Sequence, residues 1–175
     1  MGAFETANDG RSMLTDAFSN DDLAVLDYME DLDSYWKYLY AYELNYKSTC
    51  SIISKMLQAV RNDVGWKVAN FRFGHFEVVT PLLAAFDLFK DSVDVFERPA
   101  YSIDHFKNRQ YRGSVASPFA TNMALLKFEC PNDRNDPKMA IVVNGKLLKK
   151  PTSIQEIEQS MPWAFNCDAE SICRL

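Results

Sequence analysis

The sequence lacks the short motifs on which many hydrolase sites are built, and it contains only two histidines, His75 and His105. It has no Gly-rich phosphate loop of the Walker type, no Gly-x-Ser-x-Gly nucleophile turn and no His-Glu-x-x-His helix. These absences exclude P-loop nucleotide hydrolysis, esterase chemistry on a nucleophile elbow and zinc-peptidase chemistry.

Long hydrophobic runs and a positive charge balance are missing too. No stretch of about 18 apolar residues occurs, so no membrane-spanning helix is predicted. The polar N-terminus has no signal-peptide core, and there is no Asn-x-Ser/Thr sequon; taken alone, these features favour the cytosol. The net charge of −5 argues against a broad nucleic-acid-binding face, although a local positive pocket could still bind a polyanion.

What the sequence does contain is enough apolar material for one hydrophobic core. Its 175 residues are 47% hydrophobic and include 12 Phe, 8 Tyr and 3 Trp, a composition typical of folded globular proteins. The length suits a single domain. We predict a loose lead-in over residues 1–19 and one folded domain over residues 20–175.

Hydrophobic spacing predicts an α/β fold in which helices flank a sheet. Helices are expected from a cap at Asn20–Asp22 to about residue 40, from Ser48-Thr49 to about residue 61, over residues 76–89, and from Thr152-Ser153 onward. Strands are expected over residues 66–73, around Leu125–Phe128, and in a C-terminal β-hairpin over residues 139–148 with a type I′ turn at Asn144-Gly145.

Two groups of charged residues need separate interpretations. The acidic residues of the first helix are expected on a solvated face and not in a metal site: Asp27, Glu30, Asp31 and Asp33. A basic group could supply the wall of a positive pocket, with ordinary surface as the alternative: Lys107, Arg109 and Arg112.

A histidine and a carboxylate meet where the strand over residues 66–73 should lead into the helix over residues 76–89. Ligands bind at the carboxyl ends of strands in open α/β sheets, and a helix N-terminus favours an anion. Gly74 would allow close backbone approach, and Arg72 carries positive charge. His75 and Glu77 therefore predict acid–base chemistry on a phosphate, with a structural histidine as the alternative.

The four cysteines leave the redox state open. Cys167 and Cys173 lie in a short polar C-terminal segment that a disulfide between them could stabilise; two free thiols are the alternative. Their spacing does not suit zinc, which prefers about two to four intervening residues. Cys50 and Cys130 are interpreted as buried structural residues.

Several segments, in the same order, resemble one enzyme family. Gly74-His-Phe-Glu77 followed by Val-Val-Thr-Pro-Leu-Leu83 is similar to the Gly-His-Ala-Glu-Thr-Leu-Leu-Pro-Leu-Leu motif of the multiple inositol polyphosphate phosphatases, a branch of the histidine acid phosphatases related to the phytases. The helix around Leu26–Trp36, the segment Tyr111–Asn122, the hairpin and the Cys167/Cys173 tail also resemble that family. The resemblance covers roughly residues 20–175 and implies the C-terminal part of the histidine acid phosphatase fold.

The resemblance implies roles for individual residues. In this family, the histidine of an Arg-His-Gly motif attacks phosphorus, and a second histidine contacts the transferring phosphoryl group. An acidic residue protonates the leaving inositol oxygen and then activates water. His75 matches the second histidine and Glu77 the acid. Gly74, Arg72 and Arg112 are the substrate-binding candidates, and no cofactor or metal is expected.

Two departures from the family pattern limit this expectation. No Arg-His-Gly-x-Arg-x-Pro segment occurs in the chain, and Phe76 stands where the family has Ala. We expect the full-length family member to hydrolyse inositol polyphosphates in the endoplasmic reticulum lumen or outside the cell, and this chain to be inactive alone. The alternative is a non-catalytic product that at most binds phosphorylated ligands. A truncated N-terminus would explain both the missing nucleophile and the missing signal peptide.

Overall fold

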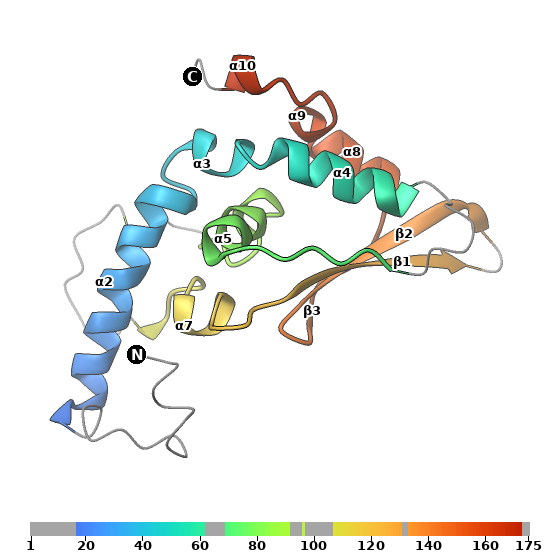
Figure 1. Ribbon diagram of the computed structural model, residues 1–175. Helices are drawn as coiled ribbons and strands as arrows, with labels where there is room; N and C mark the ends of the chain where they lie inside the picture. Colours follow the sequence, from blue (N-terminus) through green and yellow to red (C-terminus); the bar gives the residue numbers. More distant parts are fainter. Residues whose placement is uncertain (1–16, 62–68, 92–95, 97–106, 131–132, 173–175) are drawn as a thin grey trace.

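The computed structural model describes residues 17–61, 69–91, 96, 107–130 and 133–172. Helices gather on one side of the molecule and a three-stranded sheet extends from the other (Figure 1). This mixed architecture confirms the prediction of a sheet flanked by helices. No helix in these residues is long and apolar enough to cross a membrane.

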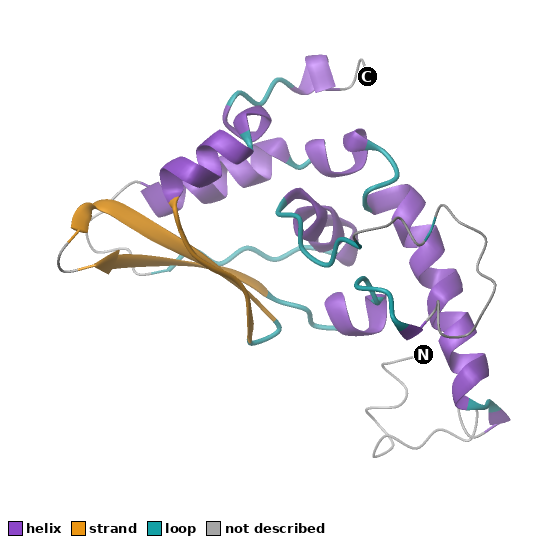
Figure 2. Cartoon of the chain, turned by 180° about the vertical axis from the view of Figure 1, so that it is seen from behind, coloured by secondary structure: helices purple, strands orange, loops and turns teal. Residues whose placement is uncertain are grey.

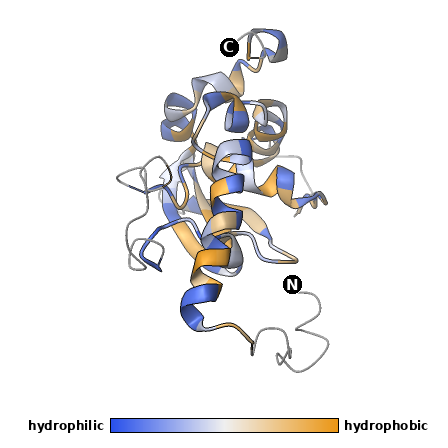
Figure 3. Ribbon diagram, turned by 90° about the vertical axis from the view of Figure 1, so that its left-hand side faces the viewer, coloured by the Kyte–Doolittle hydropathy of each residue, from blue (hydrophilic) through white to orange (hydrophobic). Residues whose placement is uncertain are grey.

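The first described helix, α2 (Asn20–Tyr38), confirms the predicted amphipathic helix but begins with a different cap. Ser19 is the N-cap: its hydroxyl accepts a hydrogen bond from the Asp22 amide, and the Asp22 carboxylate accepts one from the Ser19 amide. This is a capping box with Asp in the third position. Figure 3, which shows the left-hand side of the view in Figure 1, shows that the first residues of α2 are hydrophilic and that apolar residues follow them.

Two further helices continue from α2 (Figure 1). The short α3 (Glu43–Lys47) packs against α2, and α4 (Cys50–Arg61) follows it closely. The predicted helix after Ser48-Thr49 is confirmed, since Ile53 and Leu57 are buried one turn apart on the same face of α4.

The helix that follows the histidine, α5 (Phe76–Ala85), confirms the predicted start but ends four residues before Phe89. The Leu88 amide bonds the Leu83 carbonyl at 2.9 Å, and the Asp87 amide bonds the Ala84 carbonyl at 2.9 Å. This is the Schellman arrangement, and Asp87 takes the left-handed conformation with φ of 55°. Apolar spacing did not reveal the end, because Leu88 stays buried after the helix has stopped.

The predicted strand over residues 66–73 is wrong in its described part. Residues 69–75 form an extended coil that leads into α5, and residues 66–68 lie outside the described residues. Phe71 and Phe73 are 80% and 96% exposed. Alternation of side chains makes a segment suitable for a strand, but a strand also needs a neighbour to accept its ladder hydrogen bonds.

The sheet is an antiparallel meander in the order β1 (Met123–Cys130), β2 (Asp133–Val143) and β3 (Lys146–Ser153). The short helix α7 (Gly113–Ala116) precedes it. Val143 pairs with Lys146 across a two-residue loop in which Asn144 has φ of 49° and Gly145 φ of 77°. Positive φ at both loop residues confirms the type I′ hairpin.

Helices α4 and α8 (Ile154–Ser160) cover one face of the sheet, as seen from behind in Figure 2. Met139, Ile141 and Val143 alternate along β2 and are buried on this face. The predicted start of a helix at Thr152-Ser153 is confirmed by α8. Ser153 is its N-cap, and the Ser153 hydroxyl accepts a hydrogen bond from the Gln155 amide. Two four-residue helices, α9 (Pro162–Phe165) and α10 (Ala169–Ile172), complete the described chain.

The disulfide differs from the predicted pair. Cys167 is bonded to Cys50, 117 residues earlier in the chain, and not to Cys173, which lies outside the described residues. Folding places α9 against α4 and so brings the two Cα atoms within 5.4 Å. The interpretation of Cys50 as a buried residue is confirmed, and its sulfur also forms a covalent bond.

Candidate functional site

His75 occupies the N-cap position of α5. Its carbonyl accepts hydrogen bonds from the Val78 amide at 3.0 Å and the Val79 amide at 3.3 Å, which makes it the last non-helical residue. Its side chain makes no capping bond and is exposed. The imidazole is therefore free of any role in starting the helix.

Glu77 lies in the first turn of α5, where the positive end of the helix dipole stabilises a carboxylate. Its side chain is exposed, as are those of Arg72 and His75. Gly74 is not required by packing, since a Cβ at this position would meet Val78 at 3.7 Å, an ordinary contact. The four residues together form an open surface at the start of one helix.

Phe76, which departs from the family pattern, packs towards α2. Its ring meets the Tyr38 ring edge-on, with centroids 5.3 Å apart, and the residue remains 45% exposed. The aromatic ring thus links the start of α5 to the end of α2.

Arg112, the N-cap residue of α7, lies beside a different part of α2. Its Nε donates to Asp27 Oδ2 at 3.1 Å. Asp27 and Tyr38 are eleven residues apart on α2, which corresponds to about 16 Å along the helix axis. Among the described contacts, none joins Arg112 to His75.

Arg109 and Arg112 are bound to Asp27 and Asp31 of α2, which corrects the interpretation of these two acids as solvated, whereas Glu30 and Asp33 are exposed as expected. Asp31 is 2% exposed and Arg109 is 4% exposed. Arg109 Nε donates to Asp31 Oδ2 at 2.8 Å, and its Nη2 donates both to Asp31 and, at 2.8 Å, to Asp27. We call Asp27, Asp31, Arg109 and Arg112 the buried network, after its buried central pair, Asp31 and Arg109.

Asp31 also fixes the start of α7. Its Oδ1 accepts the Gly113 amide at 2.7 Å, and a Cβ at Gly113 would lie only 2.7 Å from the same oxygen. Burial raises the pKa of the Asp31 carboxyl to about 6, although the hydrogen bonds from Arg109 and Gly113 act in the opposite direction. The i, i+4 spacing of Asp27 and Asp31 was the available sequence signal, because it places both carboxylates on one helix face.

Lys107, the third member of the basic group, pairs with Asp21 at 2.7 Å on the surface. His105 lies outside the described residues. In the part of the chain that is described, no three His, Cys, Asp or Glu side chains gather as metal ligands would.

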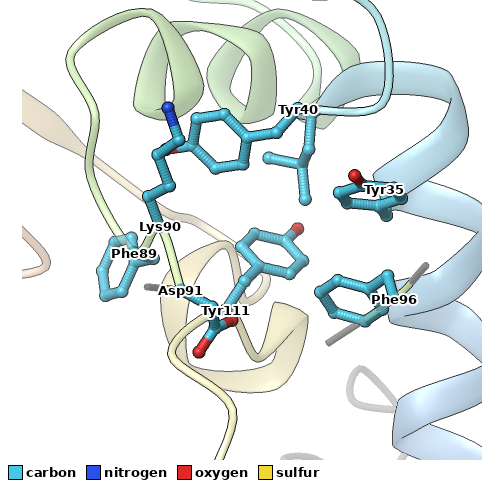
Figure 4. Close-up of a pocket in the computed structure, with 8 residues that line it drawn as sticks. Tyr35, Tyr40, Phe89, Lys90, Asp91, Phe96 and Tyr111 are labelled. Carbon is cyan, nitrogen blue, oxygen red and sulfur yellow. The ribbon is translucent and has the colours of Figure 1, made fainter. Parts of the chain in front are cut away.

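A small cavity of about 40 Å³ lies between α2 and the segment after α5, with mostly aromatic walls (Figure 4). Tyr35, Tyr40, Phe96 and Tyr111 line it, and Lys90 Nζ lies 5.0 Å from the centroid of the Tyr40 ring. A volume of this size holds about one water molecule. Neither His75 nor Glu77 contributes to its lining.

Comparison with known proteins finds similarity over most of the chain. The model of the histidine phosphatase superfamily (branch 2) matches residues 1–144. Multiple inositol polyphosphate phosphatase 1 of Homo sapiens is 29% identical over 158 residues, covering 83% of this chain and 32% of that protein. The Drosophila melanogaster protein of the same name is 29% identical over 81% of the chain and 29% of that protein.

The Gallus gallus protein of that name is 25% identical over 90% of this chain and 38% of its own length. The chain thus spans about a third of the length of the curated relatives it matches. No solved structure matches the chain. Because the family model matches most of its residues, the chain belongs to the histidine phosphatase superfamily, branch 2.

Proposed function

We propose that this chain supplies the second histidine and the proton donor of a phosphatase site that acts on inositol polyphosphates. The observation that carries the proposal is the position of His75 and Glu77 at the start of α5, both exposed and neither engaged in capping the helix. Relatives named as inositol polyphosphate phosphatases support the substrate class.

In this proposal His75 contacts the equatorial oxygens of the transferring phosphoryl group, and the N-terminus of α5 adds its dipole. Glu77 donates a proton to the leaving inositol oxygen, the charge of the bound phosphate opposing the effect of the helix dipole, and then, as the carboxylate, removes a proton from the attacking water. Gly74 lets the phosphate approach the backbone, and Arg72 supplies positive charge beside it.

Arg112 is the proposed substrate ligand that has the least structural support. Its side chain is 41% exposed, but its Nε is engaged by Asp27. It can act on substrate only through its remaining guanidinium N–H groups. The attacking histidine must come from a polypeptide segment outside this sequence, since no Arg-His-Gly motif is present.

We further propose that the family member works in an oxidising compartment, the endoplasmic reticulum lumen or the cell exterior. The Cys50–Cys167 disulfide supports this location, because such bonds persist where thiols are not kept reduced. Residues 1–175 alone are expected to release no phosphate from inositol hexakisphosphate, for want of a nucleophile.

The test is a chimera in which this chain replaces the matching third of the human relative. We expect it to hydrolyse inositol hexakisphosphate, and Glu77→Gln to lower kcat by about 10²–10⁴-fold. Glu156→Gln, at an exposed acid in the first turn of α8, is the matched control. Full activity of a folded His75→Ala or Glu77→Gln chimera would overturn the assigned roles.

A binding measurement on the chain itself provides an independent check. Inositol hexakisphosphate should shift the NMR signals of the His75 ring and of the amides of residues 76–78, and Arg72→Ala should weaken the binding. If these signals do not move, the open surface at α5 is not a phosphate site in this chain.

A further inference from the structure

The disulfide lies at one end of a series of contacts that reaches the helix of the candidate site. We propose that Cys50–Cys167 is a redox latch: when oxidised, it holds α9 against α3 and thereby fixes the position of α5. Only the functional importance of α5 rests on the proposed function; the latch itself is a property of the fold.

The disulfide and an aromatic contact connect the C-terminal helix α9 to α3. Cys50 is the first residue of α4, and Cys167 lies two residues beyond the end of α9. The bond therefore holds α9 beside α4, where the Trp163 ring of α9 meets the Tyr46 ring of α3 with centroids 6.0 Å apart.

Contacts of α3 reach α5 directly and also through Tyr40. The Tyr46 ring lies 6.4 Å from the Tyr40 ring, and the Tyr40 hydroxyl donates to the Leu88 carbonyl at 2.7 Å, just beyond the C-terminal end of α5. At the N-terminal end of α5, Phe76 contacts Tyr38, the last residue of α2, against which α3 also packs. Helix α3 also packs directly against α5.

The latch acts on α9 and α10, two helices that are too short to be stable in isolation. Each has four residues, well below the length at which an isolated helix is stable in water. A second link between the same layers, the ion pair of Arg61 with Glu158 on α8, involves an arginine side chain that is 59% exposed. Without the disulfide, α9 would depend on this ion pair and on the packing of Ala164, Trp163 and Phe165 with the core, and we expect Trp163 to separate from Tyr46 more often.

The switching step is a thiol–disulfide exchange with a dithiol. A thiolate of the dithiol attacks one sulfur of the Cys50–Cys167 bond, which breaks and leaves a mixed disulfide between the reagent and one cysteine. The second thiol of the reagent then attacks its own sulfur in that mixed disulfide and releases the cysteine. The two cysteines gain two electrons and two protons, and the dithiol becomes a disulfide. Cys50 is only 2% exposed, so the attack requires local opening or proceeds at the less buried Cys167.

The experiment uses the chain with Cys130→Ser and Cys173→Ser, in which Cys50 and Cys167 are the only possible pair. Hydrogen exchange by mass spectrometry and thermal unfolding are measured with and without dithiothreitol. We expect reduction to lower the Tm by on the order of 10 °C. Exchange in peptides from α3 and α5 should accelerate about tenfold or more, while peptides from β1 and β2 change little.

The matched control is Cys50→Ser with Cys167→Ser, in which dithiothreitol should have no further effect on α5. If reduction lowers the Tm but leaves exchange in α5 unchanged, the disulfide is a simple staple and the latch is wrong. If neither quantity changes, the bond does not contribute and the latch is equally wrong. Neither readout depends on phosphatase activity, so failure of the proposed function is distinguishable from failure of the latch.

Discussion

The buried network and the His75–Glu77 pair are both charged clusters near a helix, but they differ in how their polar groups are used. Asp31 is 2% exposed and accepts hydrogen bonds from Arg109 and the Gly113 amide. His75 and Glu77 are exposed at the start of α5, with no capping bond from the histidine. A buried charge must be paired to be tolerated, whereas an exposed one remains available to a ligand.

The difference separates charge that is consumed within the fold from charge that is exposed and available to a ligand. Arg109 is already committed to two carboxylates, so it has little capacity left to hold a phosphate. The open surface at α5 has that capacity but only one wall. The remaining part of a family member, about two thirds of the relatives' length, would have to supply the other walls.

The strongest way to break this comparison is to remove one partner of the buried network. Asp31→Ala leaves the Arg109 guanidinium buried and the Gly113 amide without its acceptor, so the free energy of unfolding should fall by about 3–5 kcal/mol. Glu77→Ala, on the open surface, should change it by less than about 0.5 kcal/mol. Urea unfolding measures both, and equal losses would contradict the contrast.

Measuring the free energy of unfolding as a function of pH sharpens the comparison, because the titration of Asp31 should change it by up to about 3 kcal/mol. The pKa of Asp31 is raised from 3.8 to about 6, so the folded state binds this proton more tightly than the unfolded state. The Asp31 contribution to the free energy of unfolding should therefore fall as pH rises from about 4 to about 6 and then level off.

Other carboxylates titrate in the same range, so Asp31→Asn is the reference for that series. The stability of the unmodified chain minus that of the variant should decrease between pH 4 and pH 6 in urea unfolding. A difference that increases over this range would show that the ion pair with Arg109 dominates over burial.

The smallest expected loss of stability comes from replacing Gly113 by alanine, with the same replacement at Gly74 as the comparison. Gly113→Ala forces a Cβ to within 2.7 Å of Asp31 Oδ1 and should cost about 1–3 kcal/mol of stability. Gly74→Ala adds a methyl group in ordinary contact with Val78 and should change stability by less than about 0.5 kcal/mol. Similar losses at both positions in thermal unfolding would mean that Asp31 moves freely away from α7.

Local patterns predicted much of the fold. The hairpin at Asn144-Gly145 depends on two adjacent residues that tolerate positive φ, and the start of α5 directly after His75 follows from a change of periodicity. The predicted strand over residues 66–73 failed because alternation describes one segment and not its partner. For the same reason, the sequence did not show that Asp27 and Asp31, unlike Glu30 and Asp33, would be covered by the segment that carries Arg109.

The sequence predicted the part of the candidate site that is a contiguous motif, but not which distant residues join it. Gly74, His75 and Glu77 are adjacent in sequence, so local structure alone places them together at the start of α5. Arg112 was grouped with them by charge, but in the structure it is bound to Asp27. Residues distant in sequence can be assigned to a site only when the packing between their elements is known.

The sequence by itself determined the elements whose cause is local: the amphipathic helices, the I′ turn, and the histidine and acid at one helix start. Tertiary structure alone decided the Cys50–Cys167 bond across 117 residues and the burial of Asp31 with Arg109. Periodicity and turn chemistry act over a few residues. Disulfide pairing and charge burial depend on which distant surfaces meet.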